Sequence, residues 1–187
     1  MTTVSEQFQI DRVASPLGTL LLVCDDAGRL RALDFHDYEA RMRRLLRAHY
    51  GERGCALRAG RGPAAVADAL AAFFAGEVHA IDHVEVRTGG SDFQRQVWSA
   101  LRHIPSGVTR SYGEVGRAIG KPGASRAVGL ANGSNPIAIV VPCHRVIGAN
   151  GSLIGYGGGI ERKRWLLAHE RRWCAAATPS ARRVVAR

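Results

Sequence analysis

The sequence lacks several features that would assign its 187 residues to a familiar class of protein. No stretch approaches the roughly 18 consecutive apolar residues that a membrane span needs. The first residues, MTTVSEQFQIDRV, do not combine a basic segment with an apolar one as secretory signals do. Its four cysteines form no CxxC pair and do not adjoin a histidine pair at zinc-finger spacing. We therefore expect a cytoplasmic globular protein with no membrane partner, no disulfide framework and no metal site.

Lysine is also scarce, since Lys121 and Lys163 are its only two positions, yet the chain is strongly basic. Lysine and arginine total 26 against 16 acidic residues, which gives a formal net charge of +10. Such an excess favours a polyanionic partner, because neutralising phosphates releases their condensed counterions. A general preference for arginine codons would give the same balance, so composition alone leaves both explanations open.

Residues 1–88 are predicted to form a small α/β domain. Apolar, strand-like segments are followed by an amphipathic helix, a loop rich in glycine and arginine, and a second helix behind Pro63. These segments are FQIDRVAS, GTLLLVCD, LRALDF, the helix at 37–50, the loop at 51–62 and the helix at 64–76. No catalytic constellation is visible here, and the arginines are interpreted as a solvated face.

Residues 89–174 have a different, mostly helical pattern. Ser91 or Asp92 can cap a first helix, and Ser111 with Glu114 forms a capping box for a second. A glycine-containing turn and a short helix at 125–133 complete a helix-turn-helix pattern. The small residues of this last helix favour a close interface over a core position; they are Ala127, Gly129 and Ala131, with Arg126 projecting near its start.

The most informative stretch is NPIAIVVPCHRVIG, residues 135–148. Its apolar residues predict a strand at 137–141 that stops at Pro142 and delivers Cys143, with His144 directly behind it. A thiol becomes a nucleophile as its thiolate, which a neighbouring base or positive charge favours. A buried structural cysteine beside a surface histidine is the alternative, and a metal site is disfavoured because neighbouring residues chelate one ion poorly.

This stretch, with SYGEV and SRAVG before it and GYGGGIERKRWLLAHE after it, resembles the bacterial O6-alkylguanine-DNA alkyltransferases, the methylated-DNA–protein-cysteine methyltransferases. The resemblance covers about residues 93–170. It implies an α/β protein with a small N-terminal α/β (ribonuclease H-like) domain and a mostly helical C-terminal winged-helix/helix-turn-helix domain. It also implies direct-reversal DNA repair, in which O6-alkylguanine (and by extension O4-alkylthymine) in duplex DNA loses its alkyl group irreversibly to the protein.

The resemblance also assigns site residues. It implies that Cys143 accepts the alkyl group, that His144 is a base oriented by Glu170, that Asn135 braces the turn, and that Tyr112 donates a hydrogen bond to the leaving base. Arg126 would fill the space left by the extruded nucleotide. DNA contacts are expected at Ser125, Arg126, Ala127, Gly129 and Ala131, and a base pocket at Val146, Tyr156, Gly157 and Gly158.

The same resemblance implies no cofactor, and a monomer that could associate cooperatively along DNA. Gly157 stands where some members carry serine, which suggests a roomier pocket. Two other functions remain open from the residues alone: a non-catalytic helix-turn-helix module that binds DNA or senses lesions, and a thiol hydrolase. Residues 175–187 are predicted to be a flexible basic tail.

Overall fold

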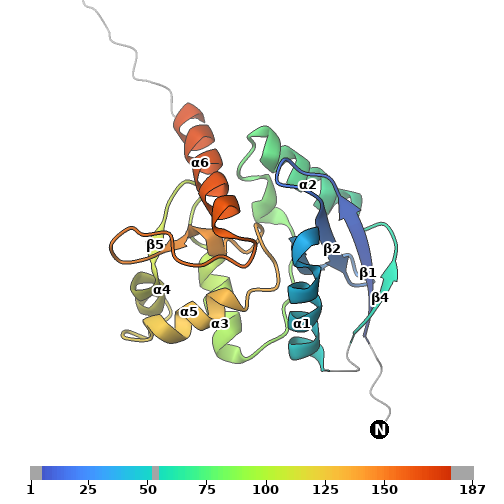
Figure 1. Ribbon diagram of the computed structural model, residues 1–187, viewed down its shortest axis with the longest axis horizontal. Helices are drawn as coiled ribbons and strands as arrows, with labels where there is room; N and C mark the ends of the chain where they lie inside the picture. The colour runs from blue at the N-terminus through green and yellow to red at the C-terminus, as the bar shows by residue number, and fades with distance from the viewer. Residues whose placement is uncertain (1–5, 52–54, 178–187) are drawn as a thin grey trace, which may run out of the picture.

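The computed structural model describes residues 6–51 and 55–177 (Figure 1). Its N-terminal half contains a four-stranded sheet in the order β3-β2-β1-β4. The strands are β1 (Glu6–Val13), β2 (Leu20–Cys24), β3 (Leu30–Phe35) and β4 (Cys55–Ala59). β2 is antiparallel to both β1 and β3, whereas β4 is parallel to β1. The predicted α/β character of this half is therefore present.

Two helices belong to this half, α1 (Glu39–Tyr50) and α2 (Ala64–Ala75), with short 3-10 helices η1 (His36–Tyr38) and η2 (Ala80–His83). Strand β2 is buried on both faces because alternate side chains enter different clusters. Leu21 and Val23 pack with Met42 and Leu46 of α1, and the opposite face enters the larger core. That core continues into the C-terminal half and includes Trp98.

The C-terminal half is mainly helical, as predicted. Its helices are α3 (Asp92–Arg102), α4 (Tyr112–Ala118), α5 (Ser125–Gly133) and α6 (Ile160–Ala177). The short strands β5 (Arg110–Ser111) and β6 (Val146–Ile147) pair in parallel, and η3 (Cys143–Arg145) precedes β6. Helices α4 and α5 lie on the side of the molecule opposite the sheet (Figure 1).

The predicted helix starts are confirmed by their caps. Ser91 accepts from the amide of Gln94 and forms a capping box with it, and Ser111 forms the predicted box with Glu114. Gly120 follows α4 with φ of 69°, a left-handed value that glycine adopts at little cost. The helix-turn-helix arrangement of α4 and α5 therefore follows from local sequence signals.

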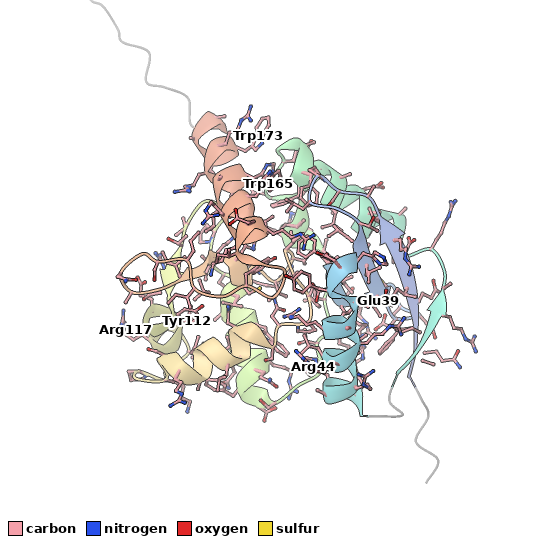
Figure 2. All side chains as sticks on the ribbon, viewed as in Figure 1. Glu39, Arg44, Tyr112, Arg117, Trp165 and Trp173 are labelled. Atoms are coloured by element: carbon pink, nitrogen blue, oxygen red, sulfur yellow. The ribbon has the colours of Figure 1, made fainter. Side chains whose placement is uncertain are left out.

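Helices α2 and α6 connect the two halves through aromatic side chains. The ring of His169 stacks on Trp165 with centroids 4.8 Å apart and lies 5.2 Å from that of Phe73. Figure 2 shows Trp165 and Trp173 on the side of α6 that faces α2. Within the described residues, no helix is both long and apolar enough to cross a bilayer.

Two predictions about local structure are wrong. The loop predicted at 51–62 contains β4, an edge strand whose short, partly charged sequence CALRA gives little strand signal. The strand predicted at 137–141 is a compact turn in which only Ile137 makes a bridge, to Leu33. These apolar residues are buried from several directions, and periodicity cannot distinguish such a turn from a buried strand.

The edge of the sheet supports that turn directly. The amide of Leu33 in β3 donates to the carbonyl oxygen of Pro136 at 2.9 Å, and the amide of Ala138 donates to the carbonyl of Leu33 at 2.8 Å. The N-terminal sheet therefore positions the segment that leads to Cys143. At the other end of the chain, α6 continues through Ala177, so the first residues of the predicted tail are helical, and residues 178–187 lie outside the described part.

Candidate active site

The turn before Cys143 is closed by one buried side chain, that of Asn135. Its Nδ2 donates to the carbonyl oxygens of Ile137 and Val141 at 3.1 and 2.9 Å, and its Oδ1 accepts from the amide of Ile137 at 3.0 Å. Ile139, inside the turn, has φ of 66°, an uncommon value for a β-branched residue. These bonds hold the backbone that presents the cysteine.

Cys143 begins η3 and is only 4% exposed. Burial raises the pKa of its thiol, because a thiolate is poorly stabilised away from water. A hydrogen bond with Asn135 and the positive charges of Arg41 and Lys163 act in the opposite direction without outweighing burial. The resting thiol is therefore protonated near neutral pH, and a base must remove its proton before it can attack.

Glu170 of α6 supplies a buried negative charge beside His144. Its Oε1 lies 2.8 Å from Nε2 of His144, and the guanidinium of Arg145 donates to both carboxylate oxygens at 2.8 to 3.1 Å. The amide of Gly107 donates a further bond at 3.1 Å. Burial alone would raise the pKa of Glu170, but His144 and Arg145 outweigh it and lower the pKa to about 2.

His144 has no exposed surface, and burial lowers its pKa despite the opposing charge of Glu170. Its imidazole is therefore neutral near pH 7. An ionised carboxylate can only accept hydrogen bonds, so Nε2 carries the ring proton and Nδ1 holds a lone pair. Among the described residues, Nδ1 finds no hydrogen-bond partner. A neutral imidazole with a free lone pair can accept a proton.

A cavity of about 590 Å³ opens beside Cys143, which is within the range of small-molecule sites. One wall is Tyr112 at the start of α4, labelled in Figure 2, whose hydroxyl lies 3.4 Å from the carbonyl oxygen of Ile154. Burial raises the pKa of Tyr112, so the phenol keeps its proton and can donate it. The other walls are Ser125, Arg126, Gly129, Asn132, Gly133, Ile154, Gly155, Tyr156 and Gly157.

The structure separates the predicted DNA-contact residues into two groups. Ser125, Arg126 and Ala127 are exposed on α5, and Gly129 is half-buried at the cavity wall. Ala131 is 2% exposed and packs in the larger core, so it does not share that surface. The reason is helical geometry, because position 131 falls on the face that meets α3.

Two predicted base-pocket residues also lie elsewhere. Val146 is fully buried and does not line the cavity, and its carbonyl oxygen accepts from Nζ of Lys163 at 2.7 Å. Gly158 is buried against the N-terminal half, where an added Cβ would lie 2.4 Å from the ring of Phe35. Tyr156 and Gly157, in contrast, do line the cavity.

Sequence reasoning missed the contribution of Arg41 in α1. Its guanidinium pairs with Asp34 at 2.6 Å and donates to the carbonyl oxygens of Gly133 and Asn135 at 3.0 and 3.1 Å. It also occupies the space beside Gly157, where an added Cβ would lie 2.4 Å from the guanidinium carbon. The room that glycine leaves is therefore filled by Arg41, so the expectation that Gly157 enlarges the pocket is wrong.

Lys163 is the second residue that sequence reasoning missed. Its buried Nζ donates to the carbonyl oxygens of Val146, Ile154 and Gly155 at 2.7, 2.8 and 3.2 Å. Burial lowers its pKa to about 8, with Cys143 acting in the opposite direction. One signal was available, because this lysine is one of only two in a chain that otherwise uses arginine.

The comparisons with known proteins agree with this geometry. Residues 92–172 match the family model described as 6-O-methylguanine DNA methyltransferase, DNA binding domain. The methylated-DNA–protein-cysteine methyltransferase of Salmonella typhimurium is 52% identical over 160 residues, which cover 86% of this chain and 94% of that protein. The chain belongs to this family. As a methylated-DNA–protein-cysteine methyltransferase, it carries out direct-reversal repair of DNA and binds DNA.

Solved structures confirm the predicted fold class of this methyltransferase. Mycobacterium tuberculosis OGT in complex with DNA is 44% identical, with a TM-score of 0.72, covering 89% of this chain and 94% of that one. A second structure, of the M. tuberculosis O6-methylguanine methyltransferase, is 42% identical with a TM-score of 0.71 over 94% and 96% of the two chains. The shared architecture is a mixed α/β sheet domain followed by a helical DNA-binding domain.

No group of three or more histidine, cysteine or acidic side chains suited to a metal ion occurs within residues 6–51 and 55–177. Charged side chains around Cys143 form ion pairs with one another. Glu170 is held by His144 and Arg145, and Asp34 by Arg41.

Proposed function

We propose that the protein accepts the alkyl group of O6-alkylguanine in double-stranded DNA on its own Cys143, once per molecule. The observation that supports this most directly is the series of Cys143, neutral His144 and ionised Glu170 at the end of a cavity. Nucleophile, base and orienting carboxylate are the parts of a hydrolase triad, here in a site that need only perform one displacement.

The first step is proton removal from the Cys143 thiol. The proton passes through one water molecule to the lone pair on Nδ1 of His144, and Glu170 stabilises the imidazolium that forms. The thiolate then attacks the alkyl carbon, so that a sulfur–carbon bond forms as the carbon–O6 bond breaks. The electron pair of that bond stays on the guanine.

Tyr112 is proposed to act on the leaving base. Its hydroxyl lies at the cavity wall, and its raised pKa keeps the proton available. A hydrogen bond to N3 of the base would strengthen as negative charge develops, which lowers the barrier more than it strengthens ground-state binding. The guanine finally recovers a proton, and the imidazolium of His144 is the proton source that balances the reaction.

Access to the alkyl group requires extrusion of the nucleotide, because O6 is shielded inside a stacked duplex. Arg126 is exposed at the cavity wall near the start of α5, where its side chain can replace the extruded base. Phosphate attraction from the net charge of +10 provides binding that is independent of sequence. A repair protein needs both properties, since lesions occur in any sequence.

The resulting thioether of Cys143 has no leaving group that the site could activate, so each protein molecule is consumed by one reaction. The proposed displacement uses no cofactor. The test is stoichiometry: excess duplex carrying one O6-methylguanine is incubated with a known amount of protein, and repaired duplex is counted. We expect repair to stop at one lesion per protein molecule. Continued turnover would contradict the proposal, and binding without any repair would favour a non-catalytic DNA-binding module.

The role of Arg126 has its own test. Arg126→Ala is expected to slow repair of duplex DNA by about a hundredfold or more, and the reaction with free O6-methylguanine base far less. Equal losses on the two substrates would contradict base replacement by this side chain.

Since the substrate is DNA, we place the reaction in the cytoplasm. We also propose that the protein acts as monomers that associate cooperatively along the duplex.

A further inference from the structure

Helix α5 carries an unusually exposed apolar side chain, Leu130. Its exposed fraction is 72%, and Ile154, at 51%, is the other large hydrophobic residue that is exposed in the described part of the chain. Ile154 lines the cavity beside Cys143 and therefore belongs to the site already described. Leu130 is not part of that wall, and neither the core nor the chemistry at Cys143 uses it.

A single exposed leucine is common on protein surfaces and by itself means little. The position of Leu130 is more informative. Residues three and four apart share a helix face, so Leu130 lies in one row with Arg126 and Gly133, both at the cavity wall. Its other exposed neighbour on the helix is Ala127. Leu130 is therefore the one bulky apolar side chain on a face made of small residues and an arginine.

We propose that Leu130 enters the groove of the bound duplex that faces α5 and packs against deoxyribose and base edges next to the extruded nucleotide. The inference rests on the proposed function, and it adds a second DNA-positioning residue beside Arg126. Four residues of helix advance by about 6 Å, which is less than two base-pair steps of about 3.4 Å. If Arg126 occupies the vacated stack, Leu130 thus reaches the adjoining steps.

An apolar side chain suits that place for two physical reasons. The sugars lining the groove offer apolar surface, and burying leucine against them removes apolar area from water. Apolar side chains inserted at base steps also unstack them and bend the duplex, which lowers the cost of keeping a nucleotide extruded. Leu130 therefore acts on DNA distortion, whereas the arginines act on charge.

The test compares Leu130→Ala with wild type on two substrates: duplex DNA with one O6-methylguanine, and the free O6-methylguanine base. Because full burial of a leucine side chain is equivalent to a factor of about ten to a hundred, we expect about a tenfold slower second-order repair of the duplex. The loss on the free base should be at least fivefold smaller. Leu130→Met, which keeps apolar volume, should restore most of the duplex rate, and Leu130→Gln should not.

A second readout does not depend on methyl transfer. A fluorescent 2-aminopurine placed at the base-pair step next to the lesion should brighten less with Leu130→Ala than with wild type at saturating protein. Equal duplex rates and equal fluorescence for wild type and Leu130→Ala would overturn the inference while leaving the methyltransferase mechanism intact. Failure of the proposed function would look different, because wild-type protein itself would then gain no methyl group on Cys143.

Discussion

Replacing Glu170 by glutamine removes the negative charge that pairs with His144 and Arg145 in the buried cluster. The side chain of Glu170 has no exposed surface, so solvent does not screen the loss. The folded protein lowers its pKa from 4.5 to about 2, a difference worth about 3 kcal/mol of folding free energy at neutral pH. Glu170→Gln should lose a stabilisation of about that size.

The pH dependence gives this prediction its sign. A carboxyl whose pKa is lowered by folding stabilises the protein above its unfolded pKa and loses that contribution as pH falls toward the folded value. For Glu170 the window runs from about pH 5 down to about pH 2, and roughly 2 kcal/mol of the contribution is lost by pH 3. The free energy of unfolding from urea titrations of wild type and Glu170→Gln should therefore converge by that amount between pH 6 and pH 3.

The matched control is Glu161→Gln on the same helix, where the carboxylate is exposed and pairs with Arg164 at the surface. That substitution should leave the unfolding curves at both pH values close to wild type. Methyl transfer by Glu170→Gln should also slow by about a hundredfold or more, because neutral glutamine cannot stabilise an imidazolium. A stability gap that stays constant between pH 6 and pH 3 would refute the reasoning.

Three further predictions follow from single contacts. Arg41→Ala should slow methyl transfer about tenfold, because it releases the turn at Asn135. Arg44→Ala, on the exposed side of the same helix, should not slow it. Equal single-turnover rates for Arg41→Ala and wild type would contradict the role of Arg41. Tyr112→Phe should slow transfer about tenfold with nearly unchanged duplex affinity by gel shift, and a large affinity loss would show that its role is binding. Lys163→Met should expose the loop that carries Ile154 and Gly155 to faster amide hydrogen exchange, and unchanged exchange would contradict its role.

Much of the fold was predictable because its signals are local. The N-cap at Ser91, the capping box at Ser111 and the apolar face of α1 each depend on residues a few positions apart, and the structure confirms them. β4 and the turn before Cys143 were missed because long-range pairing decides them. β4 exists by pairing with β1, and the turn is fixed by Leu33 of the sheet and by Asn135.

The site divides in the same way. The order Cys143, His144 is visible in the sequence, and the resemblance extended it to Glu170. The role of Arg41 could not be inferred from the sequence, because 94 residues separate it from the carbonyl of Asn135. The chain also contains many other arginines, and nothing in the sequence distinguishes Arg41 from them. The electrostatic state was also hidden: burial raises the pKa of the Cys143 thiol, so the adjacent imidazole matters as a base rather than as a positive charge.

The central claim is that Cys143 itself receives the alkyl group, and peptide mass spectrometry tests it most directly. Wild-type protein and Cys143→Ser would each be incubated with duplex carrying one O6-methylguanine, digested and mapped. We predict the mass of one added methylene unit on the peptide that contains Cys143, saturating at one per wild-type molecule, and no added mass in Cys143→Ser. A methyl group found on Cys24 or Cys174, or repair by Cys143→Ser, would contradict the account.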